Sequence, residues 1–173
     1  VAQTLGYHFV DQKFIGVILS QYGYVEFDRE YKSLPTFWER FDAQREKQRD
    51  IMVTMLNRVI QAVAHHGNVV ILGRSGFEVL GGFADVFHVR LQAPFSVRVG
   101  RVMAQEKITF EEAELLVKNN DKVRLAFVEE FYGVPWGAMQ AFDLVVNTGK
   151  VFPDVAATWV IDAANIFVSN MEI

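Results

Sequence analysis

The stretch Asn68–Leu80, NVVILGRSGFEVL, runs from an apolar, strand-like segment through two glycines into a pattern typical of a helix. Its apolar residues are continuous rather than alternating, which is typical of a strand covered on both faces in a parallel sheet. A glycine-containing turn between a strand and a helix is where α/β proteins bring backbone amides close to a phosphate. The stretch therefore predicts an α/β fold and a candidate anion site.

Two interpretations of Gly73-Arg74-Ser75-Gly76 stand open. In the first, the glycines let the chain approach a phosphate and Arg74 supplies a planar, bidentate fork. In the second, the segment is a tight turn with Arg74 in solvent, because Gly-x-x-Gly is a common spacing. The segment is not a Walker phosphate loop, since the pattern G-x-x-x-x-G-K-[ST] occurs nowhere in the chain.

Strand-like and helical segments alternate along the rest of the chain. Further strands are predicted at YHFVD, which ends in Asp11, at VFHVRL and at FDLVVN. This alternation predicts a mainly parallel sheet with helices on both faces. No repeat, low-complexity tract or linker interrupts it, so residues 1–173 are expected to form a single domain.

Two capping boxes predict where long helices begin, one at Thr36 with Glu39 and one at Thr109 with Glu112. The first of these helices is polar at its start and then amphipathic with a 3.6-residue period. Its apolar stripe comprises Ile51, Met52, Met55, Leu56, Val59, Ile60 and Val63. The final helix opens near Pro153. Its expected buried residues are Val155, Trp159, Val160 and Ala163.

Composition narrows the classes of function. The chain has 173 residues, of which 51% are hydrophobic and 22% charged, as in an ordinary globular domain. Its net charge of −4 provides no overall basic field to attract nucleic acid. The lack of cysteine excludes disulfides, thiol catalysis and cysteine-bound metals. No apolar run approaches the roughly 18 residues of a membrane span, and no signal peptide is evident. A cytoplasmic protein without nucleic-acid or membrane partners is expected.

A second group of candidate residues is basic. Arg98 and Arg101 lie three residues apart, on one face of the helix predicted after VFHVRLQAP. Lys122 and Arg124, with Asp121 beside them, lie on the following long helix. Cations from two neighbouring helices can converge on a triphosphate and its transferring group. Taken singly, each is more often a solvated surface charge.

Asp11 ends a predicted strand, where a carboxylate could bind ribose, assist a metal-bound water or cap the next helix. Local sequence favours capping. His65 and His66 precede a glycine at a helix end, where they suit the helix dipole better than a metal site. The aromatic residues expected in the core, rather than in a base-stacking platform, are Phe127, Phe131, Tyr132 and Trp136.

Five segments, LGYHFVD, VVILGRSG, VRLQAPFSVRVGRVM, NNDKVRLAF and FDLVVNTGK, resemble in this order the cytidylate kinase-like family, relatives of bacterial cytidylate kinase among the P-loop kinases. The resemblance runs from Val1 to about Val160. It implies a three-layer P-loop kinase-like fold with a helical lid at residues 105–133. It also implies ATP and Mg²⁺ as cofactors, and transfer of the γ-phosphoryl group of ATP to CMP or a related (deoxy)nucleoside monophosphate.

The same resemblance assigns roles to residues. Arg74 would hold the acceptor phosphate, and Lys122 and Arg124 fall in the stretch that closes over the phosphates. The implied catalytic residues are Arg74, Arg98, Arg101, Lys122 and Arg124. The implied substrate-binding residues are Asp11, Gly73, Arg74, Ser75, Gly76 and Asp121.

Several positions depart from the family pattern. Ser75 stands where cytidylate kinases have Asp, and Ala126 stands where another arginine falls. Lys122 replaces an arginine and loses its planar fork. After Asp11, Gln-Lys-Phe replaces a small residue and a glycine. These departures leave the acceptor base open. They also support an alternative, a non-catalytic nucleotide-binding or regulatory domain that keeps the kinase fold.

The family's phosphate loop and first strand lie upstream of the helix that ends VAQTLG. That strand is central, between the strands VVILG and FHVRL. A sheet without it exposes two apolar edges, which monomers avoid. The segment Gly73-Arg74-Ser75-Gly76 therefore resembles the acceptor half of a nucleotide site whose donor half is not among these 173 residues. A third interpretation is a structural interaction module that uses the polar helix ERFDAQREKQRD as a docking or homodimer surface, although such a stretch is more often a solvated face.

Overall fold

The computed structural model describes residues 1–21 and 43–171. Its strands are β1 (His8–Val10), β2 (Val69–Ile71), β3 (Val89–Gln92) and β4 (Leu144–Asn147). Its helices are α1 (Ala2–Leu5), α2 (Gln12–Gln21), α5 (Ala43–His65), α6 (Gly76–Val79), α7 (Phe95–Glu106), α8 (Phe110–Tyr132) and α9 (Pro153–Met171), with a 3₁₀ turn, η2, at Met139–Ala141. The capping box predicted at Thr36 and Glu39 lies outside the described residues.

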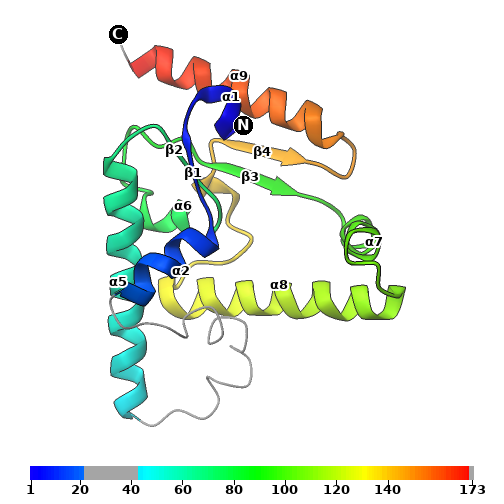
Figure 1. Ribbon diagram of the computed structural model, residues 1–173, viewed down its shortest axis with the longest axis horizontal. Coiled ribbons are helices and arrows are strands. Elements are labelled where there is room, and N and C mark those ends of the chain that lie inside the picture. Colours follow the sequence, from blue (N-terminus) through cyan, green and yellow to red (C-terminus); the bar gives the residue numbers. More distant parts are fainter. Residues whose placement is uncertain (22–42, 172–173) are drawn as a thin grey trace.

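The strand pairs among the described residues are parallel, as the alternation of elements predicted. Strand β1 pairs with β2, with His8 opposite Val69, and β3 pairs with β4, with Val89 opposite Leu144. Helices α1 and α9 lie on one side of the strands, and α2, α5, α6 and α8 lie on the other (Figure 1). The predicted three-layer α/β architecture is confirmed.

The strands form two separate two-stranded sheets, and no ladder joins β2 to β3 in the described part of the chain. This is where the resemblance leads us to expect a further strand. The residues of β2 were expected to be buried on both faces, but all three are only partly buried. Leu72, directly after β2, is 59% exposed, and so is Leu91 on β3. The expectation of full burial was wrong because, within residues 1–21 and 43–171, β2 pairs only with β1 and β3 only with β4, so each strand lacks a neighbouring strand on its other side.

The main core lies between β1–β2 and the helices α2, α5, α6 and α8. Its buried residues are Val10, Ile15, Leu19, Met52, Leu56, Val59, Ile60, Leu80, Val123 and Phe127. The apolar stripe predicted on α5 supplies the centre of this core. Ile51 was expected in the stripe but is 54% exposed. Successive helical residues are about 100° apart, so Ile51 falls at the edge of the stripe that Met52 begins.

Helices α7 and α8 form a hairpin with a small core of its own, built from Val99, Ala113 and Val117. The predicted capping box starts α8: Glu112 N–H donates to Thr109 Oγ1 (3.3 Å), and Thr109 N–H donates to Glu112 Oε2 (2.8 Å). Among the described helices, none combines the length and the apolar character needed to cross a membrane.

Helix α9 begins at Pro153 as predicted, but its apolar side is not buried as expected. Val155 is 43% exposed and Trp159 is 49% exposed, whereas Ala156 is buried. In Figure 1, α9 runs along the β3–β4 sheet, and two strands cover only part of a helix face. The burial predicted for Val155 and Trp159 was therefore wrong.

Candidate functional site

Two of the predicted site segments meet where β1 and β2 end. The ladder between these strands extends to Leu72, whose N–H donates to the Val10 carbonyl oxygen (2.8 Å). Asp11 and Gly73 therefore follow directly on neighbouring parallel strands. Ligands of α/β proteins bind at this carboxyl edge of the sheet. The structure thus brings Asp11 and the Gly73–Gly76 turn to the same edge.

The Gly73–Gly76 turn is left-handed over three successive residues, with φ of 78° at Gly73, 59° at Arg74 and 55° at Ser75. For the two non-glycine residues this conformation costs about 1–2 kcal/mol each. Arg74 is only 5% exposed and Ser75 only 7%. The alternative with Arg74 in solvent is therefore excluded. A guanidinium keeps its charge when buried, so its surroundings must provide acceptors or an anion.

Helix α6 follows this turn and has only four residues. A macrodipole is the sum of aligned peptide dipoles, so one turn of helix adds little to the attraction of an anion. The electrostatic part of an anion site here must come from Arg74 rather than from the helix.

Asp11 caps helix α2. The Phe14 N–H donates to Asp11 Oδ1 (3.0 Å), and the Ile15 N–H donates to the Asp11 carbonyl oxygen (3.1 Å). The capping role that local sequence favoured is confirmed. No group of three or more His, Asp and Glu residues is arranged to hold a metal ion within residues 1–21 and 43–171. His65 lies at the end of α5, exposed, and its ring contacts that of Phe83 (centroids 5.5 Å apart).

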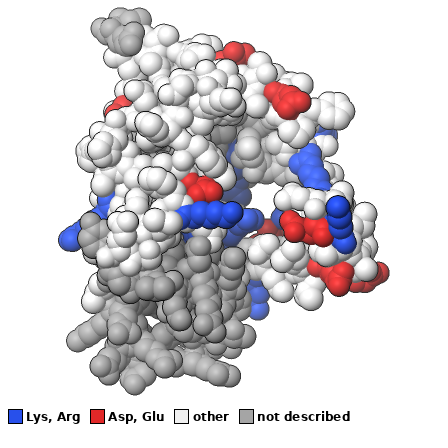
Figure 2. All heavy atoms as spheres, viewed as in Figure 1, with Lys and Arg blue, Asp and Glu red and all other residues white. Residues whose placement is uncertain are grey.

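The surface is hollowed between the α7–α8 hairpin and the rest of the molecule. Lys and Arg side chains border this hollow, with acidic side chains beside them (Figure 2). The molecule as a whole is acidic, so on the face seen in Figure 2 these basic side chains are the ones that would attract an anionic ligand.

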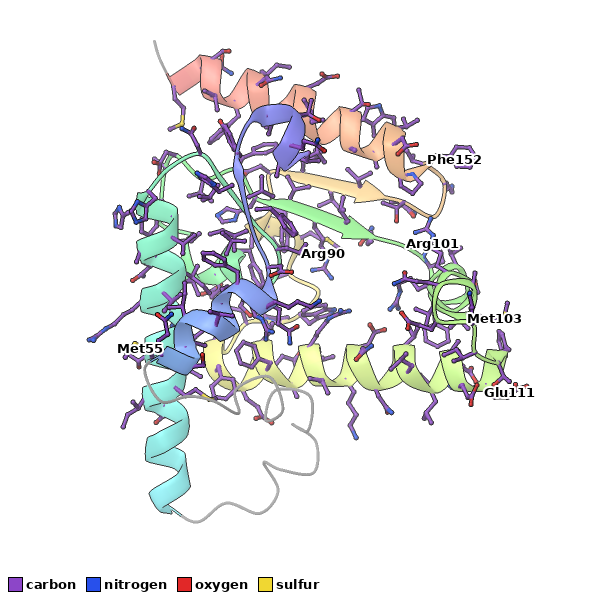
Figure 3. All side chains as sticks on the ribbon, viewed as in Figure 1. Met55, Arg90, Arg101, Met103, Glu111 and Phe152 are labelled. Atoms are coloured by element: carbon purple, nitrogen blue, oxygen red, sulfur yellow. The ribbon has the colours of Figure 1, made fainter. Side chains whose placement is uncertain are left out.

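Arg101 ties α7 to the end of β4. Its Nη1 donates to Thr148 Oγ1 (3.1 Å) and its Nη2 donates to the Thr148 carbonyl oxygen. Thr148 is itself fixed to β3, because its N–H donates to the Gln92 carbonyl oxygen (2.7 Å). In Figure 3 the Arg101 side chain points from α7 towards the turn between β4 and α9. Thr148 was not among the predicted site residues. Its position directly after a predicted strand is the one sequence feature that could have identified it as a site residue.

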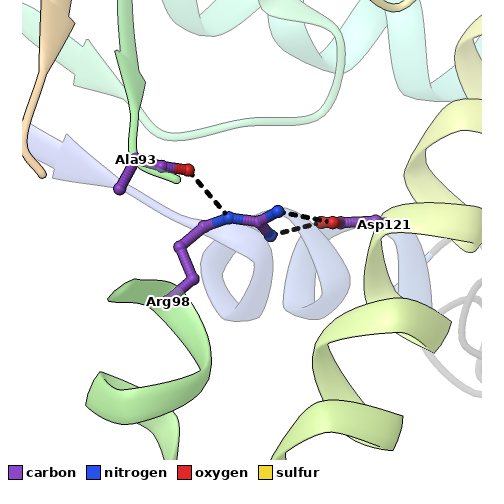
Figure 4. Close-up of polar contacts among 3 residues, drawn as sticks. All are labelled: Ala93, Arg98 and Asp121. Atoms are coloured by element: carbon purple, nitrogen blue, oxygen red, sulfur yellow. Dashed lines mark hydrogen bonds and ion pairs between the residues drawn. The ribbon is translucent and has the colours of Figure 1, made fainter. Parts of the chain in front are cut away.

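Arg98 ties α7 to α8. Its Nη1 and Nη2 donate to Oδ1 and Oδ2 of Asp121 (2.7 and 2.8 Å), and its Nε donates to the carbonyl oxygen of Ala93 (3.2 Å; Figure 4). Two predicted site residues from neighbouring helices are thus brought together. The guanidinium of Arg98 and the carboxylate of Asp121 therefore form an ion pair, although both side chains are also partly exposed to solvent.

Lys122 and Arg124 remain apart from this pair. Both side chains are exposed on α8, and neither makes an ion pair with another described residue. The structure therefore joins Asp121 to Arg98 but does not bring Lys122 or Arg124 into contact with the arginines of α7. Ala126, where an arginine was expected, is half-buried.

Arg90 is a polar site that the sequence analysis did not single out. Its Nη1 donates to the Trp136 carbonyl oxygen (2.7 Å), and its guanidinium carbon lies 5.3 Å from the ring centroids of both Trp136 and Phe142. Figure 3 shows Arg90 pointing from β3 into the layer between the strands and α8. Trp136 was expected in the core, but it packs against this cation instead. The sequence feature that could have identified this site is the presence of an arginine within the predicted strand VFHVRL.

A model of the cytidylate kinase-like family matches residues 1–150 of the chain. The chain belongs to the cytidylate kinase-like family. The resemblance seen in its five short segments is thereby confirmed, since the match takes in all of them.

Individual relatives are consistent with the family. The chain is 33% identical over 99 residues to a protein named cytidylate kinase from Ignicoccus hospitalis, covering 57% of each. It is 32% identical over 122 residues to a cytidylate kinase from Methanopyrus kandleri, covering 65% of this chain and 62% of the relative. The chain thus spans less than two thirds of the length of these relatives.

A crystal structure of an uncharacterized protein from Eubacterium ventriosum has the same fold. The TM-score is 0.71 at 17% sequence identity, over 95% of this chain and 87% of the other. At this identity the likeness concerns the fold alone. It supports the α/β kinase-like architecture that the cytidylate kinase-like family implies.

Proposed function

We propose that this protein is a nucleoside monophosphate kinase that transfers the γ-phosphoryl group of ATP to CMP or a related (deoxy)nucleoside monophosphate. The observation that carries the proposal is the buried Arg74 in a left-handed turn at the carboxyl end of β2, beside Asp11. Relatives named cytidylate kinase in Ignicoccus hospitalis and Methanopyrus kandleri support it.

Phosphoryl transfer requires positioning and charge neutralisation more than covalent chemistry from the protein. Arg74 binds the acceptor phosphate with its fork. Arg101, Lys122 and Arg124 supply positive charge on the side of the α7–α8 hairpin. Ser75 and Gly76 set the turn that aims Arg74, and Asp11 fixes the start of α2 beside it.

ATP and Mg²⁺ would supply the phosphoryl donor and its charge-neutralising cation. The described residues fit the acceptor side of such a site and not the donor side. No Walker pattern occurs in the 173 residues, and no carboxylate cluster suited to a metal lies within the described ranges.

We propose further that a parallel strand carrying a phosphate loop fills the space between β2 and β3. Two observations support this: the two sheets are not joined within the described part of the chain, and Leu72 and Leu91 at the facing strands are each 59% exposed. A structure of the native-length protein in which β2 and β3 pair directly would contradict this arrangement.

The function is tested with Arg74→Ala in the native-length protein, by measuring ADP formation with each nucleoside monophosphate. We expect kcat/KM to fall by about 100-fold, because an anion-binding donor is removed from the reacting phosphate. Arg58→Ala is the matched control, since Arg58 is an exposed arginine on α5. Near-normal turnover by Arg74→Ala with every monophosphate would refute the proposal.

The second candidate is a nucleotide-binding or regulatory domain without catalysis. Three positions favour it: Ser75 and Ala126 replace residues typical of the family, and Lys122 lacks the fork of an arginine. Calorimetric binding of CMP with no ADP formation under the same conditions would decide for this candidate. A homodimer stays a prediction, which the mass in solution at two protein concentrations would test.

A further inference from the structure

Arg98 and Arg101 lie on the same face of α7, yet their charges meet different partners. Arg101 is bound by the hydroxyl and the carbonyl of Thr148, which carry no net charge. Arg98 is bound by the carboxylate of Asp121, which cancels its charge. Two arginines that the sequence places together are therefore not equivalent as attractors of an anion.

The Arg98–Asp121 ion pair occupies the nitrogens of the guanidinium that would otherwise bind a phosphate. Both terminal nitrogens donate to the two carboxylate oxygens of Asp121, and Nε is engaged with the Ala93 carbonyl. Arginine binds phosphates through the same pair of parallel N–H donors. In this structure Asp121 thus occupies the position on Arg98 that a phosphate group would take (Figure 4).

The pair is accessible to a competing anion. The side chain of Arg98 is 32% exposed and that of Asp121 is 35% exposed. Partly exposed ion pairs contribute little net stability, so exchanging one anion for another at Arg98 requires only a small free-energy difference. The hollow beside the α7–α8 hairpin is bordered by further Lys and Arg side chains, which attract an anion to this region (Figure 2).

We propose that the Arg98–Asp121 pair is a latch that nucleotide phosphate opens. In the closed latch Asp121 binds the guanidinium of Arg98. When a nucleotide binds, one of its phosphates replaces Asp121 as the partner of this guanidinium. A ligand shifts such an equilibrium only by binding one state more tightly, and here the freed fork is the tighter state. The proposal rests on the proposed function and makes Asp121 a positioning residue that competes with substrate, not one that contacts it.

The latch is tested by isothermal calorimetry with inorganic tripolyphosphate on the intact protein. We expect Asp121→Asn to bind about threefold more tightly than the wild type, because the competing carboxylate is removed. Glu114→Gln is the matched control. It removes one negative charge from the same helix, where Glu114 pairs with Lys118 on the exposed surface (3.0 Å), and it leaves the latch intact. A merely structural role for Asp121 predicts weaker binding of Asp121→Asn, not tighter.

A second variant keeps the test informative if Asp121→Asn folds poorly. Asp121→Glu keeps a carboxylate within reach of Arg98, so it is expected to bind tripolyphosphate as the wild type does. Equal affinities for Asp121→Asn and Glu114→Gln, tighter binding by Asp121→Glu, or no binding by any of these proteins would each overturn the latch.

The experiment separates the latch from the kinase assignment, because tripolyphosphate binding is measured without turnover. If Asp121→Asn binds tripolyphosphate more tightly but the wild type phosphorylates no nucleoside monophosphate, the latch is supported and the kinase assignment is contradicted. Unchanged binding by Asp121→Asn in an active kinase counts against the latch alone.

Discussion

The body of the molecule and the α7–α8 hairpin are held together by different kinds of interaction. In the body, α2, α5, α6 and the second half of α8, which contributes Val123 and Phe127, enclose a large apolar core beside β1 and β2. In the hairpin, α7 and the first half of α8 share a small core whose buried residues are Val99, Ala113 and Val117, and α7 is joined to the β3–β4 sheet by the hydrogen bonds of Arg98 and Arg101.

This difference indicates which part can respond to a ligand. Apolar burial is non-directional and scales with area, so a bound anion cannot replace it. An arginine held by oxygen atoms can exchange them for the oxygens of a phosphate. We therefore expect the body to keep its shape on nucleotide binding and the hairpin to change its polar contacts.

The largest effect is expected in the body, at Leu56→Ala. Leu56 is fully buried in the main core, and its truncation should lower the free energy of unfolding by about 2–5 kcal/mol. Urea titration followed by circular dichroism measures it. The control is Ile51→Ala on the same helix, where the side chain is 54% exposed and a loss of about 1 kcal/mol or less is expected. Equal losses at the two positions would contradict the assignment of the core.

A smaller and local effect is expected in the hairpin, at Val117→Ala. This variant removes two buried methyl groups from a small core and should cost about 2 kcal/mol. If the hairpin opens independently of the body, amide hydrogen exchange should quicken in α7 and the first half of α8 and stay unchanged in α5. Uniform acceleration across the molecule would show instead that the two regions unfold as one unit.

The next effect concerns the start of α8. Thr109→Ala removes the side-chain acceptor that caps the Glu112 amide and should cost about 1 kcal/mol. Thr158→Ala is the matched control, because the Thr158 hydroxyl donates to the carbonyl of Asp154 within α9 and caps no helix. Its loss should change stability by less than about 0.5 kcal/mol. A larger loss at Thr158 than at Thr109 would argue against the capping box as a source of hairpin stability.

The smallest effect is a pH dependence of the hairpin. The Thr109 N–H, and then its hydroxyl, hydrogen-bond to the Glu112 carboxylate and lower its pKa below 4.5. A lowered pKa in the folded state adds stability above the ordinary pKa, and this stability is lost as the pH falls through the lowered value. The stability difference between the wild type and Glu112→Gln should therefore shrink as the pH is taken from 7 to below 4.5. A difference that stays constant over this range would show that the carboxylate charge contributes nothing.

Several features of the fold and site could be predicted because their signals are local. The capping box of Thr109 and Glu112 involves residues one helical turn apart, and the stripe of Met52, Leu56 and Ile60 follows from the pitch of one helix. The turn at Arg74 was recognisable because glycines mark both its ends. The same local order of motifs was sufficient to reveal the family.

The sequence by itself therefore determined the alternation of parallel strands and helices, the starts of α8 and α9, and the family. Only the tertiary structure decided that Arg74 is buried, that Arg98 meets Asp121, that Arg101 meets Thr148, and that Trp159 stays exposed. The physical reason is the range of the interactions. Helix caps and periodicity depend on neighbours within a turn or two, whereas the partner of a long side chain depends on which distant elements the packing brings beside it.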